Sequence, residues 1–488
     1  MRLIRKHAHL CLVSILVSNL EKIIEMKNSI AIICFVSLTG ILSSCDSFLS
    51  QNSTIDVADS DMFTDAASLE SARIGLYNSL QNQYYYGGYY QLVLDAYSDN
   101  GATGGYDNLD LDELGLKEAS ADNIYIQNVW TAIYNTIYAD NQIIANVDLI
   151  EDETLSDAVR NDIKGEALAI RGMAHFDLLK IFGEHWDATS MYGIPVVTEV
   201  LDATATRGRN TVAETFTAIL DDLLAAEALL SDTDPRYEDV MKGKQFMTKT
   251  ACTALLARVY RANMNMPMAL EKATAVISSG YATVADGALV GEIYATKFSD
   301  ESIFELAFNA QDKSAFNSLT YAREDALRSE VNFLAANDLK TFFEDRTGDV
   351  RADLLDFESN DVSIEPDGRT QKYRGEVFQD NSAYIIRISE LLLIQAEAQG
   401  FPAGNTALWD LQANRGMDAS IIDNEDQFYS AIMAERRAEL NFEGDRYADL
   451  AHFGKVAEVL GDGVLPCLPI PNREIGASGG LIEQYPGY

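Results

Sequence analysis

Apolar residues recur at helical spacing in most of the long segments of this chain, and this periodicity limits its fold more than any other feature. Val129 and Ile133 fall on one face of the helix predicted for QNVWTAIYNTIYADNQIIANVDLI. The same pattern occurs in VRNDIKGEALAIRGMAHFDLLKIFG, which ends at Gly183, a typical C-terminal cap. Thr211 and Glu214 open another periodic segment at the spacing of a capping box. The chain is therefore predicted to be mostly α-helical.

Two later segments are predicted to form helical hairpins. They are ALLARVYRANMNMPMALEKA, at 254–273, and LLIQAEAQGFPAGNTALWDL, at 392–411. Each has an Ala- and Leu-rich helix, a short polar turn, and a second helix with Ala-Leu near its start, which is typical of stacked tetratricopeptide-like repeats. We predict a curved scaffold of such hairpins, with long loops and a few short strands (in ESIFELAFNA and SAYIIRI) packed on it. An irregular helical bundle would show the same periodicity.

The segment MKNSIAIICFVSLTGILSSC has the layout of a secretory signal. Lys27 supplies the positive charge, residues 30–42 are almost uncharged, and small residues precede Cys45. A cysteine at this position is typical of bacterial lipoproteins, whose thiol carries a lipid, although an ordinary signal peptide is the alternative. We predict that residues 1–44 are removed, with Met26 as the true start, and that 45–488 form a single domain anchored through Cys45.

The charge balance excludes several classes of ligand. From residue 45 onward the chain has 32 Lys and Arg residues against 73 Asp and Glu residues. A surface with this excess of negative charge repels nucleic acids and anionic lipid headgroups. We therefore exclude nucleic-acid and phosphate binding, whereas neutral ligands such as sugars meet no such penalty.

The sequence contains no recognisable catalytic or metal-binding motif. It lacks HExxH, GxSxG, a Gly-rich phosphate loop and CxxC, and its acidic stretch DNLDLDELG lacks the pattern of a Ca²⁺ loop. Cys252 and Cys467, the other cysteines of the mature chain, could pair or remain free. We predict no catalytic residue, metal or cofactor.

Two further features are interpreted as structural. Glu435 and Glu439 lie one helical turn apart, beside arginines, where a predicted helix ends before Gly444. We predict an ion-pair network there rather than a catalytic cluster. His175 falls on the apolar side of a predicted helix and is interpreted as a core histidine rather than a ligand.

A tyrosine-rich stretch, QNQYYYGGYYQLVLDAYSDNGATGGYDN, is predicted to form a ligand-binding loop. Aromatic rings bind sugars through the C–H face of the pyranose, while polar side chains bond the hydroxyls. Core packing is the alternative for some of its seven tyrosines, notably Tyr97 on the strand-like LVLDAYSD, and loop packing for the others. The candidate ligand-binding residues are Tyr84, Tyr85, Tyr86, Tyr89, Tyr90, Asn100 and Tyr106, with Trp186, Tyr321 and Arg323 from other segments.

Ordered sequence blocks give the chain a resemblance to a known family. IIRISELLLIQAEA, ERRAELNFEGDRYADLAHFG, LPIPNREI and QYPGY resemble the SusD/RagB family of outer-membrane nutrient-binding lipoproteins. Upstream, CDSFL, KGEALAIRGMAHFDLLKIFG, GIPVVTE, TVAETFTAILDDLLAA and KTACTALLARVY follow that family's order. The chain departs from the family in the insertion EHWDATSMY after Gly183 and in Gln412-Ala413-Asn414, which replaces a more basic run.

The resemblance implies a helical fold with four tetratricopeptide-like hairpins. It also implies a lipid-anchored lid, facing outward, on a SusC-like TonB-dependent outer-membrane transporter that receives oligosaccharides or, in some members, peptides. The identity of the ligand does not follow, because the tyrosine-rich stretch lies in the family's variable region. A helical-repeat adaptor that binds only protein is the alternative function, and a glycoside hydrolase comes third.

Overall fold

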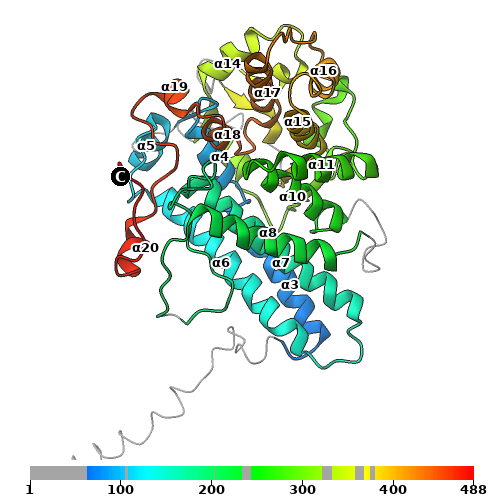
Figure 1. The fold of residues 1–488 in the computed structure, drawn as a ribbon, viewed down its shortest axis with the longest axis vertical. Helices are drawn as coiled ribbons and strands as arrows, with labels where there is room; N and C mark the ends of the chain where they lie inside the picture. Colours follow the sequence, from blue (N-terminus) through cyan, green and yellow to red (C-terminus); the bar gives the residue numbers. More distant parts are fainter. Residues whose placement is uncertain are drawn as a thin grey trace, which may run out of the picture. The chain divides into compact units, whose positions relative to one another are not determined.

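Eight helices form four pairs that stack on one another in chain order (Figure 1). This count refers to the part of the chain that the computed structural model describes, residues 63–104, 108–202, 204–232, 243–320, 332–357, 368–373 and 380–488. The pairs are α3 (Ala66–Leu80) with α6 (Ile124–Asn146), α7 (Asp157–Phe182) with α8 (Val212–Leu229), α10 (Lys249–Ala262) with α11 (Met266–Ser279), and α15 (Ile388–Gln399) with α16 (Asn405–Asn414). Consecutive pairs are joined by contacts of α6 with α7, α8 with α10, and α11 with α15. The predicted scaffold of helical hairpins is confirmed.

Residues 63–488 form one compact unit. The predicted cleavage site and lipid attachment at Cys45 lie outside the described residues. No helix within those residues is both long and apolar enough to cross a membrane.

Local capping explains where several scaffold helices begin and end. At the start of α8, the Glu214 amide donates to the Thr211 hydroxyl at 3.1 Å, and the Thr211 amide donates to the Glu214 carboxylate at 2.9 Å. This is the predicted capping box, which satisfies two amides that lack partners within the helix. At the end of α7, the Gly183 amide donates to the Leu179 carbonyl at 3.0 Å, as predicted for a C-cap.

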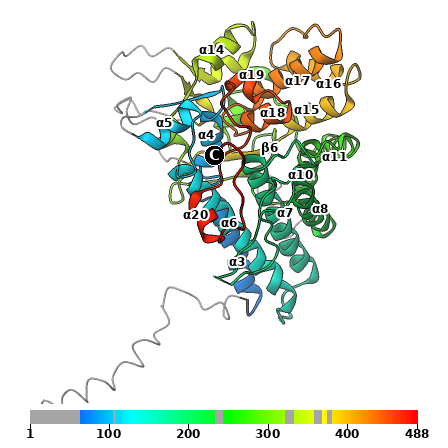
Figure 2. The same ribbon diagram turned by 60° about the vertical axis from the view of Figure 1, so that its left-hand side comes forward.

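Other elements pack on this scaffold, and most of them follow α11 in the sequence (Figure 2). Within the described residues, three antiparallel two-stranded sheets pair β1 (Gly101–Thr103) with β3 (Phe333–Ala335), β2 (Ser302–Leu306) with β6 (Ala383–Arg387), and β4 (Leu355–Asp356) with β5 (Arg369–Thr370). The remaining α-helices are α4 (Tyr89–Ala96), α5 (Leu109–Leu116), α12 (Glu292–Ala295), α13 (Phe316–Thr320), α14 (Asn337–Glu344), α17 (Glu425–Leu440), α18 (Arg446–His452), α19 (Val456–Leu460) and α20 (Asn472–Ala477). The 3₁₀ helices are η2 (Val147–Leu149), η3 (Gly287–Leu289), η5 (Val350–Leu354) and η6 (Gln371–Tyr373). The few short strands expected from ESIFELAFNA and SAYIIRI are β2 and β6.

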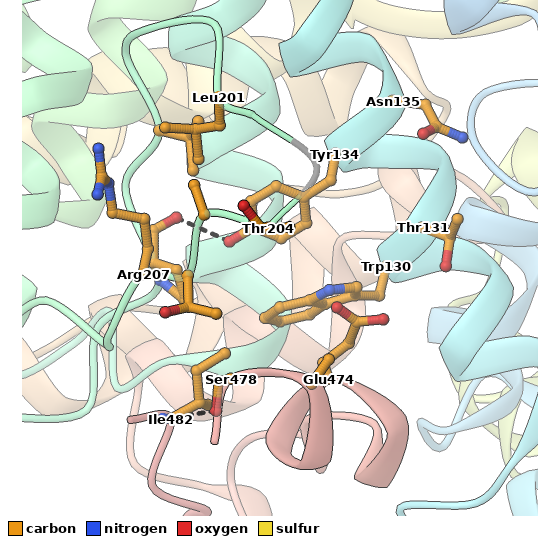
Figure 3. A pocket seen from close by; sticks show the side chains of 15 residues that line it. Trp130, Thr131, Tyr134, Asn135, Leu201, Thr204, Arg207, Glu474, Ser478 and Ile482 are labelled. Carbon is orange, nitrogen blue, oxygen red and sulfur yellow. Dashed lines mark hydrogen bonds between the residues drawn. The ribbon is translucent and has the colours of Figure 1, made fainter. Parts of the chain in front are cut away.

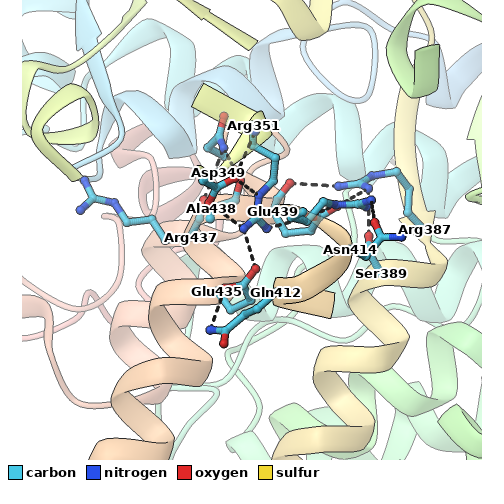
Figure 4. A network of polar contacts seen from close by, with 12 residues as sticks. Asp349, Arg351, Arg387, Ser389, Gln412, Asn414, Glu435, Arg437, Ala438 and Glu439 are labelled. Carbon is cyan, nitrogen blue, oxygen red and sulfur yellow. Dashed lines mark hydrogen bonds and ion pairs between the residues drawn. The ribbon is translucent and has the colours of Figure 1, made fainter. Parts of the chain in front are cut away.

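A buried ion-pair network at the end of α17 joins these elements (Figure 4). The Glu439 carboxylate receives N–H groups from Arg351 at 2.8 Å, from Arg387 at 2.9 Å and from Arg415 at 3.0 Å. One turn earlier, Glu435 pairs with Arg351 at 2.6 Å. Burial alone would raise the pKa of Glu439, but the three arginines outweigh that effect and hold this pKa well below its usual range. The predicted ion-pair network is confirmed.

The structure also places His175 and two cysteines in the buried core. The His175 ring is fully buried and its Nε2 accepts the Val197 amide at 3.1 Å, so its interpretation as a core histidine is confirmed. Burial is the main reason that its pKa falls to about 3, and the ring is therefore neutral at physiological pH. Cys252 and Cys467 are both buried and both free, so they do not form a disulfide.

Candidate functional site

The tyrosine-rich stretch is not a single loop. Residues 81–88 form turns, which agrees with the loop predicted for Tyr84–Tyr86, whereas α4 begins at Tyr89 and continues to Ala96, so the loop predicted for Tyr89 and Tyr90 is wrong. Tyr97, which was predicted on a strand, instead follows the last residue of α4 and is buried edge-on against Tyr447. A helix forms here because seven of its eight residues are buried against the scaffold and the strands.

Three of the candidate tyrosines point into the core. The hydroxyls of Tyr85 and Tyr86 donate to Asp177 Oδ2 at 2.7 and 2.8 Å, and the Tyr90 hydroxyl donates to Asp177 Oδ1 at 2.7 Å. Burial and the Asp177 carboxylate raise the pKa of all three phenols well above their usual value, so they remain protonated donors. All three residues are at most 2% exposed. The burial of these three rings corresponds to the packing alternative rather than to a binding surface.

Tyr84 and Tyr89 have a different environment at the surface, where Tyr84 stacks on Tyr89 and Tyr89 stacks on Tyr125. The Tyr84 and Tyr89 rings lie 5.0 Å apart at an angle of 24°, and the Tyr89 and Tyr125 rings lie 5.2 Å apart at 27°. All three rings are partly exposed. We call these three residues the aromatic stripe. It provides a surface of the kind that binds the apolar face of a sugar.

Polar groups border the aromatic stripe. The Asn108 amide donates to the Tyr125 hydroxyl at 2.8 Å. Neither the Tyr84 nor the Tyr89 hydroxyl bonds to another residue of the described chain. Burial, followed by the neighbouring phenols, raises the pKa of Tyr89 to about 12, so its hydroxyl remains a donor at neutral pH.

Several segments that are distant in sequence meet beside the aromatic stripe. The Tyr89 ring contacts Phe333 of β3 edge-on at 6.1 Å, and the Gly87 carbonyl accepts the Ala315 amide at 2.7 Å just before α13. The Gly104 amide donates to the Asn332 carbonyl at 2.9 Å at the end of the β1–β3 pair. The chain continues from these points into residues 105–107 and 321–331. The candidates Tyr106, Tyr321 and Arg323 belong to those segments and lie outside the described residues.

The other two candidates make structural contacts. Asn100 is fully buried, where its amide donates to Asp95 at 2.9 Å and its side-chain oxygen accepts Arg437 Nε at 2.9 Å. Trp186 is partly exposed and packs against the apolar cluster of α18 and α19, with its ring edge-on to His185. Among the described candidates, the structure therefore brings Tyr84 and Tyr89 together at the surface. Asn100 and Trp186 make their contacts elsewhere in the structure.

Tyr125 was not among the residues expected from sequence. It lies in the first turn of α6, after the capping residue Asn123, whose side chain accepts the Tyr125 amide at 3.1 Å. The signal that could have identified it is an aromatic residue at an exposed helix start. Within the described chain, no group of three or more His, Cys, Asp or Glu residues is arranged to hold a metal ion.

Two family models match the chain. One, SusD-like, is described as starch-binding and associating with the outer membrane, and it matches residues 47–261. The other is described as the SusD family and matches residues 364–462. The matched regions together include α3, α6, α7, α8 and nearly all of α10, and they include Glu439 with its partners Arg387 and Arg415.

Individual relatives and a solved structure are similar to this chain as well. SusD-like protein P25 of Formosa agariphila is 26% identical over 51% of this chain, which covers about half (46%) of that relative. SusD-like protein P2 of the same organism is 22% identical over 93% of this chain and 99% of its own length. A solved structure, a laminarin-binding SusD-like protein, superposes with a TM-score of 0.73 at 21% identity, over 87% of this chain and all of the other. From the two family models, these relatives and the shared fold, this chain belongs to the SusD/RagB family.

Proposed function

We propose that this protein is an outer-membrane lipoprotein, exposed at the cell surface, that binds oligosaccharides without cleaving them and delivers them to a SusC-like TonB-dependent transporter. The observation that carries the proposal is the aromatic stripe of Tyr84, Tyr89 and Tyr125. The partly exposed, stacked rings offer an apolar platform, and the hydroxyls of Tyr84 and Tyr89, which bond to no other residue of the described chain, offer hydrogen-bond donors; a neutral sugar requires both.

Charge and relatives support the same ligand class. The large excess of acidic residues disfavours anionic ligands but has little effect on a neutral glycan. A laminarin-binding protein shares the fold, and one of the matching family models is described as starch-binding. Neither comparison identifies the sugar that this chain binds, and a peptide ligand is the alternative within the family.

Calorimetric titration of the purified protein with a panel of neutral oligosaccharides tests this function. We expect saturable heat with at least one glycan and, in the same samples, no shortened products by chromatography. Peptides of similar length serve as the comparison ligands. Release of shorter sugars would contradict the non-catalytic role, and binding to peptides alone would replace the glycan with a peptide ligand.

The membrane anchor and the partner can be tested in one fractionation experiment. Tagged wild-type protein is expected in the outer-membrane fraction and, after gentle detergent extraction, in a complex with a β-barrel protein. The Cys45→Ala variant should be lost from the membrane fraction, because the acyl chains that would contribute about 0.8 kcal/mol per buried CH₂ are missing. A Cys252→Ala variant is the control, since that thiol is buried and free. Membrane retention of the Cys45→Ala variant would refute the anchor, and recovery of wild type without a barrel in several detergents would refute the complex.

A further inference from the structure

A hollow of about 430 Å³ lies between α6, residues 195–202 and 204–207, and the C-terminal residues around α20 (Figure 3). Figure 3 shows Trp130 and Tyr134 of α6 facing Leu201 across this hollow. We call it the α6 pocket. Its volume falls within the range of about 300–1,000 Å³ that is usual for small-molecule sites.

The α6 pocket is separate from the aromatic stripe, although both use α6. Tyr125 of the stripe and Tyr134 of the pocket are nine residues apart on this helix. At 3.6 residues per turn this spacing is about two and a half turns, so the two side chains leave opposite sides of the helix. A ligand in the pocket therefore does not contact the stripe through α6.

One wall of the α6 pocket is held rigidly although it has no regular secondary structure. The Pro195 carbonyl accepts the Tyr134 hydroxyl at 2.7 Å, and the carbonyls of Val197 and Glu199 accept the Asn141 amide at 3.2 and 3.1 Å. The Val197 amide is also fixed by the buried His175 ring. Because side chains of α6 and α7 satisfy these backbone groups, residues 195–199 of the wall are in place before any ligand arrives.

The charge of the α6 pocket disfavours anionic ligands. Among the described residues, Arg207 is the only basic residue that lines the pocket, and it is paired with Glu199. Glu474 also lines the pocket and makes no ion pair with a basic residue of the described chain. The uncompensated charge is therefore negative, which disfavours phosphates and carboxylates.

The remaining chemistry of the pocket matches a neutral, hydroxyl-rich molecule. Apolar surface comes from Tyr134, Leu201 and Ile482, and an amide and a hydroxyl come from Asn135 and Thr131. A carboxylate such as that of Glu474 accepts strong hydrogen bonds from ligand hydroxyls. We propose that the α6 pocket is a second saccharide site, which binds a short neutral saccharide independently of the aromatic stripe. This inference rests on the proposed glycan-binding function.

The test uses the fluorescence of Trp130, which lines the α6 pocket, as the reporter. The chain has two other tryptophans, Trp186 and Trp409. In a Trp186→Phe/Trp409→Phe background, titration with mono- and disaccharides is expected to give a saturable change in emission. Glu474→Gln should weaken the saccharide affinity measured by this response about tenfold or more, because hydrogen bonds to a charged acceptor are replaced by bonds to a neutral amide. The matched control is Glu483→Gln, which removes the same charge at an exposed position outside the pocket lining.

The outcomes separate this inference from the proposed function. A response that survives alanine substitution of Tyr84 and Tyr89 but is lost in Glu474→Gln supports an independent second site. Glycan binding by calorimetry without any Trp130 response, or with equal affinity in Glu474→Gln and wild type, overturns the second site and leaves the proposed function standing. A Trp130 response to alkylamines but not to saccharides also overturns it, since the pocket would then bind cations. Absence of glycan binding in both assays contradicts both proposals.

Discussion

Replacing Glu439 with alanine is expected to lower the free energy of unfolding by about 3–5 kcal/mol, the range for removing one partner of a buried ion pair. The substitution leaves the guanidinium groups of Arg351, Arg387 and Arg415 close together and without the carboxylate that they share. Each of these groups is almost fully buried, so water cannot replace the lost partner without opening the core. Urea unfolding followed by circular dichroism measures the effect.

The matched control for this prediction is Glu425→Ala, the same change at an exposed position in the first turn of α17. This control should lower the free energy of unfolding by less than about 1 kcal/mol, the usual contribution of an acidic residue near a helix N-terminus. Equal destabilisation by the two substitutions would show that the network contributes little.

The pH dependence of the Glu439 contribution has a definite sign. Because the folded-state pKa is held well below the ordinary value of about 4.3, the carboxylate stabilises the fold fully above that value. The contribution is lost as the pH falls from there through the folded-state pKa. The stability difference between wild type and Glu439→Ala should therefore be constant from pH 6 to 8 and shrink in acid.

The parts of the fold that were predicted correctly depend on short-range signals. The capping box of Thr211 and Glu214 and the C-cap at Gly183 involve residues at most four apart, and helical periodicity is visible within a single segment. The sequence predicted that Glu439 belongs to an ion-pair network, but not which residues pair with it. Its partners Arg351 and Arg387 lie 88 and 52 residues away, and no spacing within α17 indicates them.

The candidate site could be predicted only in part, because the orientation of each tyrosine depends on distant residues. Tyr85, Tyr86 and Tyr90 turn inward because Asp177, about ninety residues later on α7, accepts all three hydroxyls. The composition of the stretch gives no sign of that carboxylate. The Gly-Gly pair at 87–88 favoured a continued loop, but α4 begins at the next residue. Tyr125 was missed for the same reason, since its neighbours Tyr84 and Tyr89 reach it only through the packing of α4 on α6.

Substituting Tyr84, Tyr89 and Tyr125 together with alanine is expected to weaken glycan binding more than a hundredfold. Each aromatic contact contributes on the order of 1 kcal/mol, so loss of three corresponds to about 3 kcal/mol, and each 1.4 kcal/mol is tenfold in the dissociation constant. The fold should persist, because all three rings are partly exposed and lie outside the buried cluster around Asp177. Calorimetry with the glycan that binds wild type measures the loss, and circular dichroism verifies the helical content.

Two sets of phenylalanine variants distinguish stacking from hydrogen bonding and from structure. Phenylalanine at Tyr84 or at Tyr89 retains the stacked rings and removes one hydroxyl, so each single variant should weaken binding by about tenfold or less, the equivalent of one typical hydrogen bond. Phenylalanine at Tyr85 or Tyr86 removes a hydroxyl from Asp177 inside the core, so it should lower the free energy of unfolding by about 1 kcal/mol and leave the affinity unchanged. Wild-type affinity in the triple alanine variant would exclude the aromatic stripe from the binding site. A loss of affinity in Tyr85→Phe equal to that of the triple variant would show that binding depends on the buried tyrosines through the fold and not on the exposed rings.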